Sequence, residues 1–212
     1  MLKTVRVVFS KTGRARFISH LDLVRTMTRV VRRAEIPLWY TEGFNRHPYL
    51  TFAAPLSLGF EGLRESMDLR LEEDMPYDEL VARLNAAFPE GLSAISAAEA
   101  VHKVGTLTAA RYRLRFDCPP EVMIALLSHK EILVEKRTKK KTLKTLDIRP
   151  AFENAEVSSC DGGTQVMVTL PVGNDTVNPS LLLQALNAAS DEDYHLHVLR
   201  LDLLMADGKP FC

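Results

Sequence analysis

The chain has few cysteines, no long apolar run and no net charge, and each of these shortages argues against a class of protein. Its three cysteines, Cys118, Cys160 and Cys212, are too widely spaced to suggest a zinc site or an iron–sulfur cluster. No segment approaches the roughly 18 uninterrupted apolar residues of a membrane helix, and no early apolar run follows the first residues. We therefore expect a cytoplasmic protein that has no membrane contact, no metal and no other cofactor.

The sequence does contain enough apolar residues for a substantial core, because 46% of its 212 residues are hydrophobic. The zero net charge hides an uneven distribution. Residues 1–47 hold ten Lys and Arg against three Asp and Glu, whereas residues 48–100 hold three against ten. A cationic segment is therefore followed by an anionic one, and this pattern bears on binding partners more than the overall charge does.

The most informative stretch of the chain lies between Phe9 and Phe60 and contains one clear helix. Ser19 is a good N-cap, and Asp22 supplies the negative charge that the first turn of a helix favours. We predict a helix that begins at His20 and ends before Pro37, which cannot continue it. Apolar residues recur on one side of this helix at three- and four-residue steps. The opposite side carries Arg25, Arg29, Arg32 and Arg33.

The first half of the chain alternates between strand and helix patterns. We predict strands over 4–10, 49–58, 66–72 and 92–101 and a second helix over 76–88, with a short hairpin arm over 15–18. This is the βαββαβ order of a ferredoxin-like unit. Its antiparallel sheet is expected to carry both helices on one face and to leave the other face free.

The second half repeats the same order of elements. Strands are predicted over 111–116, 131–138, 164–170 and 195–205, helices over 120–129 and 179–189, and an additional hairpin strand over 146–157. We therefore expect an α+β protein made of two tandem ferredoxin-like (βαββαβ) units with antiparallel sheets. The predicted domains are 1–104, which carries the informative stretch, and 105–212, which carries a basic hairpin near 136–144.

Three segments of the first half resemble the radical SAM-linked protein family. They are SKTGRARFISHLDL at 10–23, RRAEIPLWYTEGFNRHP at 32–48 and LTFAAPLSLGFEG at 50–62. Members of this family are bacterial proteins that are fused to radical SAM proteins or encoded beside them. The resemblance is specific over about 5–68, and it implies a bacterial protein that works with a radical SAM partner.

Clustered cationic residues are the main signal of function. Arginines on adjacent helical turns, joined by basic residues before the helix, form a surface suited to phosphates. The expected RNA-binding residues are Lys11, Arg14, Arg16, Arg25, Arg29, Arg32, Arg33, Arg46, Lys139, Lys140 and Lys141. RNA that is single-stranded or structured fits better than DNA, because a ferredoxin-like sheet can offer aromatic rings for stacking. The candidate rings are Phe17, Trp39, Tyr40, Phe44, Tyr49 and Phe52. The alternative is a solvated helix face that the acidic 61–79 region partly neutralises.

Two histidines and one loop are further candidates. His20 and His47 are the candidate catalytic residues, because a neutral imidazole can take a proton from a ribose hydroxyl while arginines stabilise the developing charge. Alternatively, each histidine fixes backbone geometry. The loop over 42–48 is a candidate ligand or partner loop, with a structural role as its alternative. Its polar residues are Glu42, Asn45, Arg46 and His47.

Three functions are open from the sequence. The first is an accessory RNA-binding or substrate-recruiting module that assists a radical SAM partner and is not itself an enzyme. The second is a metal-independent enzyme that cleaves or modifies RNA with His20 or His47. The third is a protein–protein adaptor without nucleic acid. The oligomeric state is open.

Overall fold

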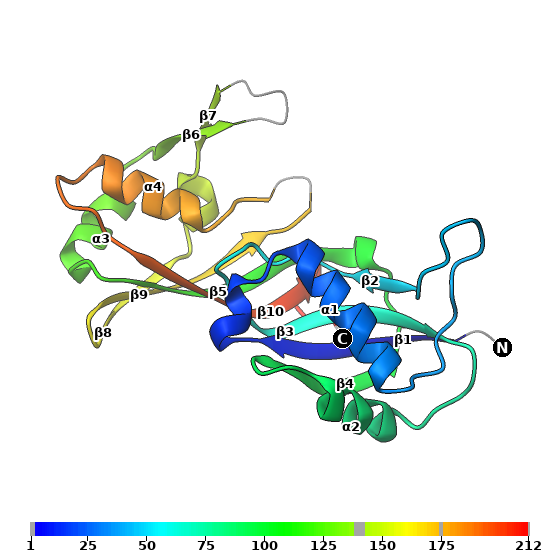
Figure 1. Ribbon diagram of the computed structural model, residues 1–212. Coiled ribbons are helices and arrows are strands. Elements are labelled where there is room, and N and C mark those ends of the chain that lie inside the picture. The colour runs from blue at the N-terminus through cyan, green and yellow to red at the C-terminus, as the bar shows by residue number, and fades with distance from the viewer. Residues whose placement is uncertain (1–2, 138–142, 174–175, 212) are drawn as a thin grey trace. The chain divides into compact units, whose positions relative to one another are not determined.

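The structure is a computed structural model that describes residues 3–137, 143–173 and 176–211. These residues form an α+β protein with four α-helices and ten strands, and the strand pairings are mostly antiparallel (Figure 1). The chain divides into two compact units, Met1–Thr108 with Arg200–Cys212, and Ala109–Leu199. We refer to them as unit 1 and unit 2. No helix in the described ranges is long and apolar enough to cross a membrane.

Unit 1 contains the informative stretch of the sequence. Its elements are β1 (Lys3–Lys11), the 3-10 helix η1 (Gly13–Phe17), α1 (His20–Arg33), β2 (Leu50–Phe52), β3 (Glu61–Leu71), α2 (Tyr77–Ala87), β4 (Leu92–Glu99) and η2 (Val104–Thr106). The strands lie in the order β4-β1-β3, and β2 pairs with β3. All three of these pairings are antiparallel. Strand β10 (Leu196–Met205) also lies next to β3, and its residues from Arg200 onward belong to this unit.

The core of unit 1 lies between one face of the sheet and the two helices. Val5, Val7 and Phe9 of β1 alternate along the strand and pack in a single cluster with buried residues of α1 and α2. Both helices therefore cover the same face of the sheet, as Figure 1 shows. This agrees with the expected placement of the helices.

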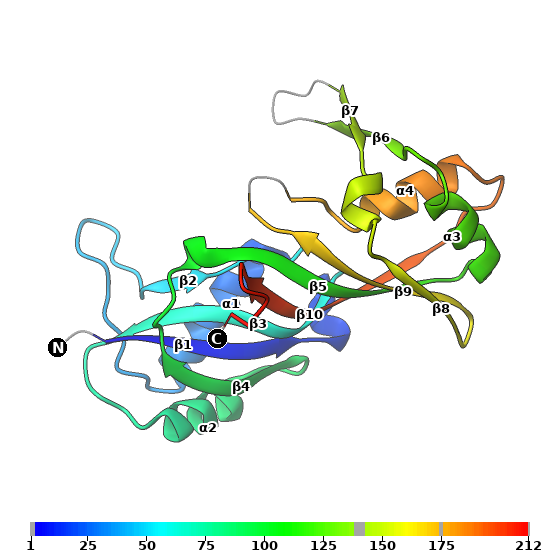
Figure 2. The same ribbon diagram turned by 180° about the vertical axis from the view of Figure 1, so that it is seen from behind.

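The opposite face of the sheet is not free as predicted. Arg6, Ser66 and Asp68 point to this face, and all three are buried. The guanidinium of Arg6 lies 3.8 Å from the ring centroid of Phe211, and Ser66 donates a hydrogen bond to the carbonyl oxygen of Phe211. Figure 2 shows the red C-terminal segment on this side. This cover could not be predicted from local patterns, because Phe211 is more than 140 residues away from Ser66 along the chain.

Unit 2 holds the second set of elements. They are β5 (Leu107–Phe116), α3 (Pro120–Leu127), β6 (Leu133–Arg137), β7 (Leu143–Asp147), η3 (Arg149–Phe152), β8 (Glu156–Cys160), β9 (Gly163–Pro171) and α4 (Ser180–Ala188). Strands β5, β9 and β8 pair in that order and are antiparallel. Strands β6 and β7 form a separate two-stranded hairpin. The first residues of β5 and the last of β10 belong to unit 1, so the chain passes between the units along these two strands.

Several predicted elements have different bounds in the structure. The strand expected over 49–58 is only Leu50–Phe52, since Pro55 cannot donate a ladder hydrogen bond. The hairpin arm expected over 15–18 is wrong, because this stretch lies mainly in the 3-10 helix η1. The single strand expected over 146–157 is also wrong. It is the end of β7, the helix η3 and the start of β8, because Pro150 favours a helical start.

Candidate functional site

Helix α1 is oriented by its two ends and by its buried face. At the N-terminus, the amide of Asp22 donates to the hydroxyl of Ser19 at 3.1 Å, which confirms the predicted N-cap. At the C-terminus, Glu35 takes a left-handed conformation (φ 52°) that ends the helix. The buried residues are Leu23, Met27, Val30 and Val31. Because this face packs against the sheet, the opposite face of α1 must lie toward solvent.

Three arginines lie along that solvent-facing side. Arg25, Arg29 and Arg32 are spaced at four and three residues, which places them on successive turns of one side of the helix. All three are exposed. We call them the arginine stripe. It brings three permanent positive charges to one exposed surface of unit 1.

The arginine stripe is only weakly neutralised. Arg25 pairs with Asp22 at 3.3 Å, but both side chains are more than half exposed. Arg32 donates from Nε to the hydroxyl of Tyr40 at 3.4 Å, which leaves its charge unpaired. Arg29 makes no hydrogen bond or ion pair with any residue that the structure describes. Exposed ion pairs such as Arg25–Asp22 contribute about 0–1 kcal/mol, so a phosphate can compete for Arg25.

The ion pairs seen for the acidic 61–79 region in the described part of the chain do not involve α1. Four carboxylates of this region form ion pairs with residues outside α1, and two of these pairs are buried. The pairs are Arg6–Asp68, Glu65–Arg200, Lys3–Asp74 and Glu79–Arg83. The interpretation of α1 as a helix face neutralised by residues 61–79 therefore finds no support in these contacts.

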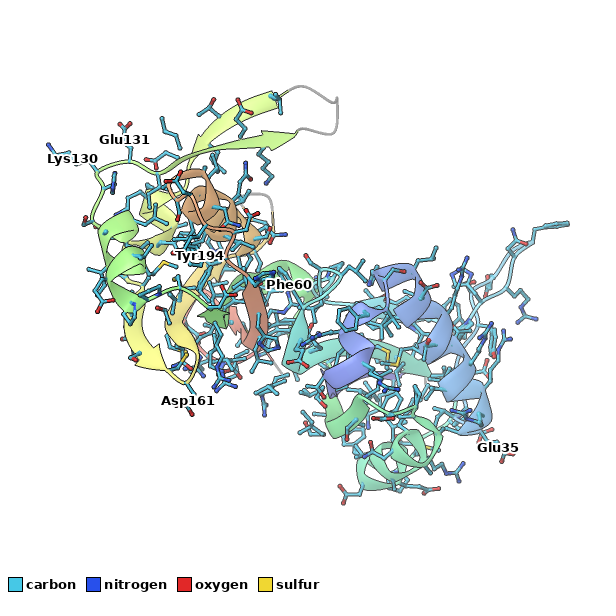
Figure 3. The ribbon with its side chains drawn as sticks, turned by 60° about the vertical axis from the view of Figure 1, so that its left-hand side comes forward. Glu35, Phe60, Lys130, Glu131, Asp161 and Tyr194 are labelled. Carbon is cyan, nitrogen blue, oxygen red and sulfur yellow. The ribbon has the colours of Figure 1, made fainter. Side chains whose placement is uncertain are left out.

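Arg33 lies apart from the arginine stripe. Its guanidinium donates a hydrogen bond to the carbonyl oxygen of Ala87 at the C-terminus of α2. This contact favours a cation, because the last carbonyls of a helix carry partial negative charge. Arg33 therefore joins two helices of unit 1. Figure 3 shows Glu35, which follows α1, at the end of this helix.

The basic residues before α1 divide into exposed and buried ones. Arg14 is exposed, and Arg16 is half-buried with its guanidinium 4.6 Å from the ring centroid of Phe17. Lys11 is only 1% exposed, and its ammonium donates to the carbonyls of Arg16 and Ile18 at 3.3 Å each. Burial lowers the pKa of Lys11, Glu65 opposes that change and Arg200 adds to it. Lys11 therefore fixes the entry to α1 and does not belong to the exposed surface.

The two candidate catalytic histidines have separate contacts. The ring of His20 packs edge-on against Phe52, with 5.3 Å between centroids. His47 is exposed, and its Nδ1 lies 3.0 Å from the carbonyl oxygen of Asn45 and 3.2 Å from the hydroxyl of Thr41. Within the described residues, no contact joins the two rings. The ring of His47 therefore contacts the backbone of its own loop, and the ring of His20 contacts an aromatic side chain.

The loop over 42–48 is closed at its base and exposed at its tip. The amide of Thr41 donates to the carbonyl of His47 at 2.9 Å, and Tyr40 and Pro48 form a β-bridge. Between these contacts Glu42, Asn45 and Arg46 are exposed. Phe44 is also fully exposed. The loop therefore presents one anion, one cation and one apolar ring on a fixed base.

The basic hairpin of unit 2 is only partly described. Lys139, Lys140 and Lys141 lie outside the described residues. Lys136 of β6 is exposed and donates to the carbonyl of Thr176 at 3.4 Å. Across the described parts of the chain, no group of three or more His, Cys, Asp or Glu has a geometry that could hold a metal ion.

Arg70 was not among the predicted site residues, although the two rings beside it, Trp39 and Tyr49, were candidate rings for stacking. The guanidinium of Arg70 lies 4.5 Å from the ring centroid of Tyr49 and 4.9 Å from that of Trp39. Alternation over 66–72 indicated that Arg70 points away from the core. The sequence did not indicate which rings lie beside it, because Trp39 and Tyr49 are on other segments. We call these three residues the Arg70 cluster.

The fold and site define a class: an α+β protein with antiparallel strands, whose first unit carries an exposed arginine-rich helix. The comparisons give the family. The family described as "Uncharacterized protein conserved in bacteria (DUF2344)" matches residues 4–191, and the chain belongs to this family. The search of curated proteins found no match.

Proposed function

We propose that this protein is an accessory RNA-binding module that recruits RNA, or a modified-RNA substrate, for a radical SAM partner. The observation that carries the proposal is the arginine stripe, in which Arg29 has no partner among the described residues and Arg25 has only an exposed one. Arg14 and Arg46 are also exposed in this unit and add two further positive charges.

The physical basis is the release of counterions. Each Lys or Arg that neutralises a phosphate displaces condensed cations from the nucleic acid, so binding weakens steeply as salt rises. Three guanidinium groups on successive helical turns can each contact a phosphate of a flexible strand. A surface of this kind binds without strong sequence preference, which suits a module that delivers RNA to a separate catalytic protein.

The radical SAM partner and the finer fold are part of the same proposal. The partner rests on the sequence resemblance over 5–68. The first of two ferredoxin-like units is supported by the strand order β4-β1-β3-β2 in unit 1, with α1 and α2 as its two crossover helices. In the proposed function, the radical SAM partner carries out the reaction and this chain binds the RNA.

A salt titration tests the proposal. We expect a fluorescently labelled RNA to bind at low salt, with a slope of log affinity against log salt that falls by about two in an Arg25→Ala, Arg29→Ala double variant. The matched control is Lys103→Ala, Lys130→Ala, which removes two exposed charges elsewhere; Figure 3 shows Lys130. Absence of RNA binding at low salt, together with capture of the partner protein, would instead support the adaptor function.

The partnership has its own test. Co-purification of the tagged chain with a radical SAM protein from the same cells should recover both proteins, and nuclease treatment separates direct contact from contact through RNA. Failure to recover the partner under either condition would remove this part of the proposal and leave RNA binding to the salt titration.

A further inference from the structure

The Arg70 cluster lies on the face of the sheet away from α1 and α2. Leu69 and Leu71 belong to the core beneath the helices, so Arg70 between them points to the opposite face. The amide of Trp39 donates to the carbonyl of Arg70 at 2.8 Å, and the amide of Tyr49 donates to the carbonyl of Trp39 at 3.0 Å. These bonds place the three residues side by side on neighbouring extended segments.

The guanidinium of Arg70 is held by rings and not by a carboxylate. It lies 4.5 Å and 4.9 Å from the two ring centroids, and the rings are 6.1 Å apart at an angle of 56°. Cation–π contacts orient the plane of a guanidinium but leave its N–H groups available. Arg70 makes no ion pair with a described residue, and the nearby carboxylate of Asp68 is bonded to Arg6.

The three side chains of the cluster are also accessible. Trp39, Tyr49 and Arg70 are each only partly buried. An unpaired base can therefore contact the exposed part of a ring while its phosphate accepts hydrogen bonds from Arg70. This combination of an aromatic surface and a cation is how proteins bind single-stranded nucleic acids.

A continuous path connects this cluster to the arginine stripe. Arg32 contacts the hydroxyl and the ring of Tyr40, which directly follows Trp39. Tyr40 forms a β-bridge with Pro48, which directly precedes Tyr49. The stripe lies on the helical side of the sheet and the cluster on the other. A strand that contacts both must bend around the edge near Tyr40, which a single strand can do and a rigid duplex cannot.

We propose that Trp39, Tyr49 and Arg70 form a nucleotide-binding site for an unpaired residue of single-stranded RNA, in which a ring contacts the base and Arg70 binds the phosphate. This inference rests on the proposed function and adds to it the class of RNA and a second contact on the other face of unit 1.

Trp39 provides a direct readout, because it is the only tryptophan in the sequence. We expect a ten-residue oligouridylate to quench its fluorescence and to bind at least tenfold more tightly than a blunt RNA duplex of equal length. Arg70→Gln is expected to weaken oligouridylate binding by about tenfold, the size of one lost charge-assisted hydrogen bond. The matched control is Arg115→Gln, which changes an exposed arginine on strand β5.

The possible outcomes separate the inference from the proposed function. In one outcome, oligouridylate binds and its affinity depends on Arg25 and Arg29 as expected. If it then leaves the Trp39 emission unchanged and Arg70→Gln binds it as tightly as the wild type, the nucleotide site is refuted and the RNA-binding function stands. Equal affinity for duplex and single strand also refutes the site. No binding of either RNA at low salt refutes both. A second variant, Tyr49→Leu, together with circular dichroism of all variants, separates loss of the site from loss of folding.

Discussion

At the level of single residues, burial separates the charges that hold unit 1 together from those that are available to ligands. Arg6 is 1% exposed and donates to both carboxylate oxygens of Asp68, at 2.8 Å and 2.9 Å. It also donates to the carbonyl of His102 at 2.8 Å. Buried ions need such complete hydrogen bonding, because desolvation costs each of them several kcal/mol. The arginine stripe has no comparable set of partners in the described structure.

The Arg6–Asp68 pair gives the first prediction about stability. Replacing Asp68 with alanine leaves Arg6 charged and buried, so we expect the free energy of unfolding to fall by about 3–5 kcal/mol. Urea unfolding followed by circular dichroism measures this change. The control is Glu79→Gln, which removes an exposed ion pair with Arg83 and should cost less than about 1 kcal/mol. If both substitutions lowered the free energy of unfolding by the same amount, burial would not be the reason for the contribution of the Arg6–Asp68 pair.

At the level of elements, α1 was the most predictable part of the chain, because its signals are local. The cap at Ser19, the spacing of the apolar residues and Pro37 all depend on neighbours within a few residues. The helix begins at the predicted His20 and places Arg25, Arg29 and Arg32 on the exposed side. The different contact of Arg33 could not be predicted, because it depends on the carbonyl of Ala87 in another helix.

The N-cap gives the second prediction. Ser19→Ala removes the acceptor of the Asp22 amide, so we expect the free energy of unfolding to fall by about 1 kcal/mol. Ser19→Asn, which keeps an acceptor, should restore most of it. Urea unfolding at neutral pH measures both variants. A Ser19→Asn variant that is as unstable as Ser19→Ala would show that the cap does not act through this hydrogen bond.

The same cap predicts a dependence on pH. The hydroxyl of Ser19 donates to Asp22 at 2.7 Å, and this bond, followed by Arg25, lowers the pKa of Asp22 below its ordinary value of about 3.8. A lowered pKa in the folded state stabilises the protein above the unfolded value, and this contribution is lost as pH falls through the folded pKa. We therefore expect the difference in stability between the wild type and Ser19→Ala to narrow below about pH 4. A constant difference down to pH 2.5 would contradict this.

At the level of the whole molecule, the chain leaves unit 1 along β5 and returns to it along β10. The last residues then complete unit 1. Arg200 donates to the carboxylate of Glu65, with 2.9 Å between Nε and Oε1, and Phe211 is only 3% exposed against the guanidinium of Arg6. The stability of the unit that carries the arginine stripe therefore depends on the C-terminal residues.

Phe211 gives the prediction at this scale. Phe211→Ala removes a buried ring from the sheet face of unit 1, and we expect a loss of about 3–5 kcal/mol in the free energy of unfolding. Lys209→Ala is the control, because Lys209 is an exposed neighbour whose pair with Asp207 is also exposed. The same denaturant titration serves both variants. A loss below 1 kcal/mol for Phe211→Ala would show that the C-terminal cover is dispensable.

Local patterns, within a few residues of each other, indicated the order of the longer strands and the α-helices of unit 1. They also indicated the cap of α1 and the separation of its apolar and cationic sides. These features could therefore be inferred before any coordinates. Three features could not be inferred in this way. They are the burial of Lys11, the contact of Phe211 with Arg6, and the contacts of Arg70 with Trp39 and Tyr49. Each of these depends on contacts between segments far apart in the chain, and local periodicity carries no information about which distant segments will meet.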